Sequence, residues 1–388
     1  MNSWVFITFL LYFLVLIAIG AVAYRRTSDL ADYILGGRRL GSWVSAFSAQ
    51  ASDMSGWLLM GLPGLAYTKG LQASWMVLGL IGGTYLNWKF VAAPLRTSTY
   101  TYDDSLTIPV FFERRFNDET RLLRLTSASV ILLFFTFYTS SGLVAGAKLF
   151  ESVFEIPYRT ALTAGTAAIL LYTLIGGFIA VSWTDLIQGI LMVSALVAVA
   201  LMGLWLVGGP AAMATRYTGD HAALLSPLTD ATGQSLGWIS ILSLLGWGLG
   251  YFGQPHILAR FMAIKSKFRV PFARRIAVTW VITCLVAAVL AGMLGLQLLD
   301  DPLSGAETEK VFIHLTEFLL HPAVAGVVLA AILAAIMSTA DSQLLVASAA
   351  VAEDLYSGFL NNNASRRKLL WVGRLAVIGI SLTAYAIA

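Results

Sequence analysis

The chain has 388 residues, of which 58% are hydrophobic and only 12% charged, with a formal net charge of +4. Soluble domains carry about 25% charged residues, so this composition excludes a soluble globular protein and indicates an integral membrane protein. The positive charge lies in short segments between apolar runs and does not indicate nucleic-acid binding. The single cysteine, Cys284, excludes a disulfide framework and is expected to be a small apolar packing residue. The four histidines lack zinc-protease spacing, so no metalloenzyme is expected.

Apolar runs of about 20 residues, the length that crosses a bilayer, recur along the whole chain. The first run, Trp4–Tyr24, is followed rather than preceded by arginines, which favours a retained helix over a cleaved signal peptide. In chain order, the predicted spans are 3–24, 41–66, 71–94, 125–149, 159–181, 185–208, 237–260, 275–299, 323–352 and 370–388.

Lysine and arginine fall mostly in loops on one side of these spans. The positive-inside rule assigns that side to the cytoplasm, so the N-terminus is expected outside. The basic residues assigned to the cytoplasmic side are Arg25, Arg26, Arg38, Arg39, Arg96, Arg114, Arg115, Arg121, Arg124, Arg260, Lys265, Lys267, Arg269, Arg274, Arg275, Arg366, Arg367, Lys368 and Arg374.

The second predicted span contains a carboxylate, Asp53, within the small and polar stretch Ser52–Gly56. A charge at bilayer depth costs about 2.5–3.5 kcal/mol on insertion scales, so such a residue usually faces a cavity, a partner or an ion. The surrounding residues are poor helix formers, which predicts a break in this span. A broken membrane helix with an acid at its midpoint indicates a cation-coupled transporter.

A second break is predicted in the seventh span, where Gly246–His256 contains four glycines and a proline. Each broken helix would then open a unit of opposite topology, 41–208 and 237–388, with 3–24 as an extra helix. This arrangement predicts an all-α membrane protein with an inverted repeat and a binding site at the unwound midpoints. The second unit has four spans where five are expected, so this repeat is expected to be incomplete.

The ninth predicted span and the first break carry candidate sodium ligands, because a hard cation needs oxygen ligands. The break in the second span is expected to expose the carbonyls of Ala51 and Met54. On the ninth span, helical spacing places polar side chains on one face. An alternative is that the hydroxyls only bond back to carbonyls of their own helix, although a second acid favours a polar function. The residues on this face are Ser338, Asp341 and Ser342, with Thr339 about 100° away.

Asp185 allows two compatible interpretations. It follows Ser182 by three residues, which fits a capping box at the start of the sixth span. It is also an acid near the membrane and is a candidate for a role in ion exit.

Three aromatic residues are candidates for a solute site. Trp247 and Tyr251 flank the second break, and Tyr138 lies in the middle of the fourth span. Aromatic residues in membrane helices usually serve packing or interfacial positions. Beside an unwound segment, however, an aromatic face can pack against a small ring or cover an ammonium group.

Long stretches of the chain resemble the sodium:solute symporter family. The resemblance implies a LeuT-like core of ten helices with flanking ones, about three more helices than are present here, and uptake of L-proline with Na+ by alternating access across the bacterial inner membrane. Membrane lipid is the expected surrounding, with no obligatory protein partner. The segments that carry the resemblance are Asp32–Arg38, Ser52–Gly64, Gly176–Asp185, Gly246–Met262 and Ala334–Thr339.

The resemblance also implies residue roles. Asp53 would be essential to sodium binding and coupling, and Asp185 would help sodium to leave toward the cytoplasm. Two alternatives stay open: a symporter for another small solute, and a non-transporting remnant or sensor. The implied sodium ligands are Ala51, Met54, Ala335, Ser338 and Thr339, and the implied proline-site residues are Tyr138, Trp247, Tyr251 and Pro255.

Overall fold

The computed structural model describes residues 3–24 and 30–388, and this part of the chain is almost entirely helical. Arg25 and Arg26, which contribute to the orientation prediction, lie outside the described residues. The helices are α1 (Ser3–Tyr24), α2 (Leu30–Leu35), η1 (Gly36–Arg38), α3 (Ser42–Met54), η2 (Gly56–Leu58), α4 (Gly61–Lys69), η3 (Gly70–Ala73), α5 (Ser74–Phe90), α6 (Ala92–Thr101), α7 (Ile108–Arg115), α8 (Leu122–Phe154), α9 (Tyr158–Leu206), α10 (Pro210–Arg216), η4 (Gly219–Leu225), α11 (Trp238–Gly246), η5 (Trp247–Gly253), α12 (Pro255–Ala263), η6 (Lys267–Arg269), α13 (Val270–Leu298), η7 (Gly305–Lys310), α14 (Val311–Leu319), α15 (Pro322–Ala349), η8 (Ala350–Leu360) and α16 (Arg366–Ile387).

Every predicted span coincides with helix. In the described chain, six helical segments are long and apolar enough to cross a membrane by length and composition: α1, α8, the part of α9 from Gly177, α13 with η6, α15 with η8, and α16. The remaining predicted spans are the broken or shorter helices α3–α4, α5–α6, the first part of α9, and α11–α12. The protein is therefore a multi-pass membrane protein.

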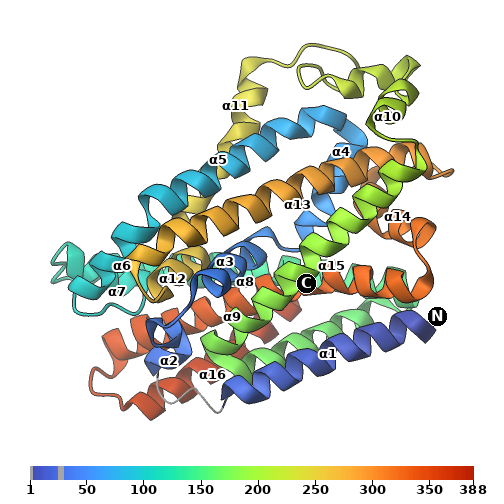
Figure 1. Ribbon diagram of the computed structural model, residues 1–388. Helices are drawn as coiled ribbons and strands as arrows, with labels where there is room; N and C mark the ends of the chain where they lie inside the picture. Colours follow the sequence, from blue (N-terminus) through green and yellow to red (C-terminus); the bar gives the residue numbers. More distant parts are fainter. Residues whose placement is uncertain (1–2, 25–29) are drawn as a thin grey trace.

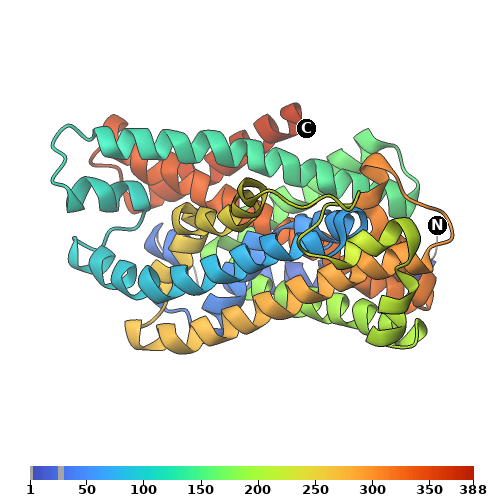
Figure 2. The same cartoon turned by 90° about the horizontal axis from the view of Figure 1, so that it is seen from above.

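The helices form two packed groups. In one group, α13 packs against α3, α4 and α5, while α5 packs against α11 and η5. In the other group, α15 packs against α1, α8, α9 and α16. The groups meet where α9 contacts α3 and α13 and where α15 contacts α3 and η2. Figures 1 and 2 show the resulting elongated bundle, with α6 and α7 at one end and α10 and α14 at the other. We call these the α7 end and the α10 end.

Both predicted breaks are present. The α3 helix ends at Met54, and Ser55 has φ 51° and ψ −172°, so the chain turns through η2 before α4 begins. The predicted stretch Ser52–Gly56 is thus correct to within a few residues. In the second broken helix, α11 gives way to the 3-10 helix η5 and to an extended Gln254 before α12.

Glycines allow α5 to lie directly against the second break. A Cβ atom at Gly83 would lie 2.2 Å from the carbonyl oxygen of Gly248, and one at Gly79 would lie 2.3 Å from that of Leu245. Such backbone contact is typical of small residues at membrane-helix interfaces. It holds the unwound η5 segment in place.

The α9 helix contains the predicted fifth and sixth spans and breaks at Gly177, which has φ 58° and ψ −170°. A Cβ atom there would lie 2.8 Å from the Tyr33 ring, so both the conformation and the space require glycine. The second part of α9 therefore begins well before Ser182. The capping-box interpretation of Ser182 and Asp185 is wrong, because both residues lie inside the helix.

Candidate solute cavity and sodium site

A cavity of about 470 Å³ lies between the two broken helices, α8 and α15. This volume is within the usual range for a small-molecule site. Its wall includes Asp53, Ser55, Trp57, Tyr138, Lys148, Trp247, Tyr251, Glu309, Thr339 and Gln343. Lys148 and Glu309 are substantially exposed, whereas Gln343 is fully buried. The cavity therefore runs from the surface at the α10 end into the middle of the bundle.

Four of the predicted sodium ligands meet beside this cavity. The Ser338 hydroxyl donates to the Ala51 carbonyl at 2.8 Å, which joins α15 to the last turn of α3. The hydroxyls of Ser338 and Thr339 both donate to the Ala335 carbonyl, each at 3.1 Å. The hydrogen bonds within α15, which the sequence left open as an alternative to a sodium site, thus occur together with the contact to α3. Met54 is the last residue of α3 and lines the cavity.

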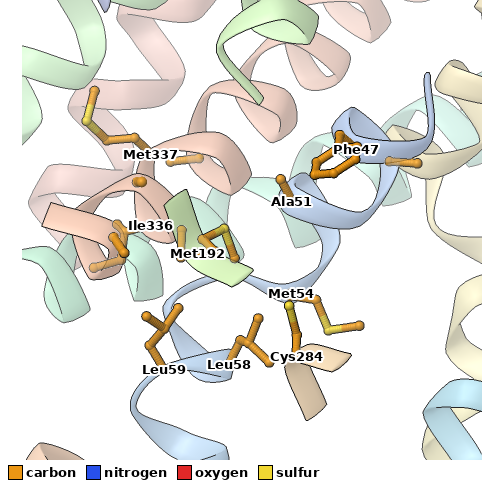
Figure 3. Close-up of a cluster of buried hydrophobic side chains, with 14 of the residues drawn as sticks. Phe47, Ala51, Met54, Leu58, Leu59, Met192, Cys284, Ile336 and Met337 are labelled. Carbon is orange, nitrogen blue, oxygen red and sulfur yellow. The ribbon is translucent and has the colours of Figure 1, made fainter. Parts of the chain in front are cut away.

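Buried apolar side chains pack around the first break, next to this group of oxygens. Figure 3 shows Met54, Leu58 and Leu59 of the first broken helix near Met192 of α9 and Ile336 of α15. All five side chains are buried. An oxygen cluster backed by such packing suits a hard cation, which prefers oxygen ligands. Cys284 belongs to the same packing and is fully buried on α13, as expected from the sequence.

Asp53 faces the solute cavity. Its carboxylate lies next to the Tyr251 hydroxyl, and the Tyr138 hydroxyl lies next to Ser55. Tyr251 also donates to the Met54 sulfur at 3.9 Å, so the two broken helices are connected through this tyrosine. Asp53, the acid predicted within the second span, therefore lies on the cavity wall next to the first break.

The predicted solute-site residues divide into two groups. Tyr138, Trp247 and Tyr251 line the cavity, whereas Pro255 does not. Pro255 begins α12 and borders a groove between α8 and η5. Sequence reasoning missed Trp57, which stacks on Trp247 with ring centroids 6.0 Å apart and an interplanar angle of 20°. Its signal in the sequence was its position four residues after Asp53.

Asp185 belongs to a buried polar network further toward the α7 end. Its carboxylate accepts from the Ser48 hydroxyl at 2.6 Å and from the Arg260 guanidinium at 3.1 Å. Arg260 also donates to the Ser48 hydroxyl at 2.9 Å, to the His256 carbonyl at 2.9 Å and to the Ser342 hydroxyl at 2.5 Å. This network joins α3, α9, α12 and α15.

The assignment of Arg260 to a cytoplasmic loop is wrong. The residue lies in α12 and is fully buried against Asp185. The error has a physical reason: a count of basic residues treats each one as solvated, while the counter-ion that permits burial is 75 residues away in the sequence.

Two further arginines close the α7 end. Arg38 donates to Asp104 at 2.7 Å, to Thr99 at 3.1 Å, and to the carbonyls of Met262 and Ser105, each at 2.8 Å. It thereby ties η1 to α6, α12 and the loop after α6.

The second arginine, Arg124 of α8, donates to Glu113 of α7 at 2.9 Å and to the Glu353 carbonyl of η8 at 2.6 Å. Both Arg38 and Arg124 are buried. The α7 end is therefore held together by charged hydrogen bonds between elements that are distant in sequence.

These features define the class of the protein. Two broken membrane helices flank a solute-sized cavity, and an oxygen cluster lies at one of the breaks, which is the arrangement of a secondary transporter. The protein is thus a transporter and not an enzyme.

The chain belongs to the sodium:solute symporter family, whose model matches residues 33–388. It is 50% identical to a sodium/proline symporter of Escherichia coli over 98% of this chain and 76% of that protein. It is 47% identical to a high-affinity proline transporter of Bacillus subtilis, over 96% of this chain and 78% of that protein.

Solved structures confirm the LeuT-like fold expected from the sequence. A Na+-coupled sialic acid symporter in a substrate-bound outward-open state superposes with a TM-score of 0.84 at 19% identity, covering 99% of this chain and 81% of that one. MhsT in complex with L-phenylalanine superposes with a TM-score of 0.60 at 15% identity, covering 89% and 78%. At these identities the likeness concerns the fold alone.

Proposed function

We propose that this chain is a bacterial inner-membrane symporter that takes up L-proline together with Na+, with its N-terminus outside. The observation that carries the proposal is the contact between Ser338 and Ala51 at 2.8 Å, beside a cavity of about 470 Å³ lined by Tyr138, Trp247 and Tyr251. Relatives at 42–50% identity that are named sodium/proline symporters support the choice of solute.

In the proposed cycle, Na+ enters from the α10 end and binds the oxygens of Ala51, Met54, Ala335, Ser338 and Thr339. These ligands come from α3 and α15. The ion therefore holds the first break against the helix group that contains α15. Asp53 supports occupancy of the sodium site from the adjacent cavity wall, and proline binds in the cavity. The units 41–208 and 237–388, with 3–24 as an extra helix, then rearrange to open the α7 end. Asp185 helps the ion to leave on that side.

The driving force is sufficient for nutrient uptake. One Na+ moving through 100 mV gains about 2.3 kcal/mol, and a tenfold sodium gradient adds about 1.4 kcal/mol. At one-to-one coupling, the sum supports roughly 500-fold accumulation of a neutral solute.

Uptake of radiolabelled proline by cells expressing the chain tests the proposal. Uptake should require Na+ and should be lost when choline replaces it. Competition by a panel of amino acids, sugars and pantothenate tests the solute, and only close analogues of proline should compete. Equal uptake in choline would contradict sodium coupling, and stronger competition by another solute class would contradict proline as the substrate.

Variants test the sodium site. Ser338→Ala and Thr339→Ala should each raise the sodium concentration for half-maximal uptake by about 10- to 100-fold, because each removes one oxygen ligand from an ion. Asp53→Asn should raise it at least as much. Ser348→Ala is the matched control: its hydroxyl is buried on the same helix and donates to Leu345, but it lies outside the cavity. An unchanged sodium requirement in the Ser338 and Thr339 variants would contradict the site.

A further inference from the structure

Gln343 is a buried amide that the sodium site and the aromatic wall do not account for. It is fully buried on α15, and neither its amide nitrogen nor its carbonyl oxygen has a hydrogen-bond partner among the described residues. A buried amide without partners costs about 1–3 kcal/mol by mutational measures, and buried polar groups are nearly always satisfied. Such a group in a binding cavity calls for a ligand.

The position of Gln343 connects it to the cavity. The α15 residues on the cavity wall are Ile336, Thr339, Ala340 and Gln343, which are spaced as one face of a helix. Gln343 lies one turn beyond Thr339 in the direction away from the exposed mouth. It therefore forms the polar floor of the cavity next to the proposed sodium ligands.

The charges around the cavity indicate which solute group this floor receives. Lys148 is the one Lys or Arg among the described wall residues, and it lies at the mouth, 4.0 Å from Glu309. Asp53 lies on the other broken helix and, as an acid, supplies no positive charge to a carboxylate. The carboxylate of an amino acid deep in the cavity must therefore be received by neutral donors. A glutamine amide offers two N–H groups for that purpose.

We propose that Gln343 binds the carboxylate of the transported amino acid through its amide N–H groups. This inference rests on the proposed function and adds to it a substrate contact on α15, opposite the aromatic residues of η5. It assigns to one residue the discrimination between a free α-carboxylate and an ester or amide of the same solute.

The test compares proline with proline methyl ester, which keeps the ring and the imino nitrogen but lacks the anionic carboxylate. In Gln343→Ala, we expect the KM for proline to rise about 10- to 100-fold, the range for a hydrogen bond to a charged group. The inhibition constant of the methyl ester should change less than twofold, as should the sodium requirement. Gln343→Glu should weaken proline binding further, because an ionised side chain repels the carboxylate.

Gln297→Ala is the control variant. Gln297 lies on α13 and also has a buried, unpartnered side-chain oxygen among the described residues. Its amide N–H donates to the Met213 carbonyl of α10, and the residue does not line the cavity. Its KM for proline should be unchanged. The amount of folded protein, measured by size-exclusion chromatography, separates a loss of binding from a loss of folding, and binding to purified protein replaces uptake where a variant does not transport.

Three results would overturn the inference. They are an unchanged KM for proline in Gln343→Ala, an equal weakening of proline and its methyl ester, and an equal effect in Gln297→Ala. If the unsubstituted chain takes up proline with Na+, any of these results removes the role of Gln343 alone. If the unsubstituted chain neither transports nor binds proline, the proposed function fails as well.

Discussion

The two ends of the molecule are held in different ways. At the α10 end, the cavity reaches the surface beside the exposed ion pair of Lys148 and Glu309, at 4.0 Å. Toward the α7 end, Arg38, Arg124 and Arg260 are buried, and each donates to several groups on distant elements. The cavity is thus open toward the α10 end and closed toward the α7 end. Charged hydrogen bonds between arginines and backbone or carboxylate oxygens maintain this closure.

Arginine suits this task for a physical reason. Its guanidinium presents five N–H donors in a rigid plane and stays ionised when buried. One such side chain can therefore bind several helices at once, and their separation requires all of these bonds to break together. A closure of this kind switches between two states rather than yielding gradually, as alternating access requires.

The largest effect is expected at Arg260. Arg260→Ala leaves the Asp185 carboxylate buried without its cation, which typically destabilises a protein by about 3–5 kcal/mol. The thermal melting temperature of the purified variant should fall steeply, and proline uptake should be lost.

The double variant Arg260→Met with Asp185→Leu is the control for this prediction, because it removes both charges. It should recover much of the melting temperature, although not the transport. An Arg260→Ala variant that melts like the unsubstituted protein would contradict the assignment of closure to this network.

Arg38→Ala should weaken the closure without unfolding the protein. The variant loses four hydrogen bonds that join η1, α6 and α12. We expect the α7 end to open more often, by at least about tenfold, since each charged hydrogen bond contributes about 1.5–3 kcal/mol. A cysteine at Ala259, which is buried on α12 near this end, reports the opening by its rate of thiol labelling. Cys284→Ala provides the cysteine-free background.

The control for Arg38 is Arg115→Ala. Arg115 is exposed on α7 and lies over the rings of Phe111 and Phe116 rather than within a buried network. Its removal should leave the labelling rate within about twofold. Equal labelling in the two variants would show that the number of positive charges, and not the buried geometry, sets the closure.

A smaller effect on stability and on the closure is expected when a substitution adds a methyl group next to Arg124. A Cβ atom at Gly358 would lie 2.9 Å from the Arg124 Cζ atom, and Arg124 is held on both sides by Glu113 and the Glu353 carbonyl. Gly358→Ala should therefore displace the guanidinium, destabilise the protein by about 1–2 kcal/mol, and raise labelling of the Ala259 cysteine several-fold. Gly379→Ala is the control, because nothing lies within 4 Å of a Cβ atom there, and it should not raise the labelling.

The same contrast explains what could be predicted from the sequence. Hydropathy located the long apolar helices, and the clusters of glycine and small polar residues located both breaks, because these are local properties of the chain. The oxygens of Ala51, Ser338 and Ala335 were expected to come together through the family resemblance, and their mutual contacts confirm that they do.

The closure of the α7 end could not be predicted in this way. Arg38, Arg124 and Arg260 were treated as solvated loop charges, because their partners lie up to 229 residues away and carry no local signal. Gln343 was missed for a similar reason. In the sequence it is one of several polar residues between positions 338 and 343, and only the fold shows that its side chain lies on the cavity wall.

The smallest effect is expected at the cavity mouth. Lys148 and Glu309 are 43% and 51% exposed and 4.0 Å apart, so water and salt screen their attraction. Lys148→Gln and Glu309→Gln should each change the KM for proline by less than about threefold, and neither should alter labelling of the Ala259 cysteine. A change above about tenfold in either measurement would show that the exposed pair also gates the cavity. The contrast between the two ends would then disappear, because the open α10 end and the closed α7 end would both depend on ion pairs.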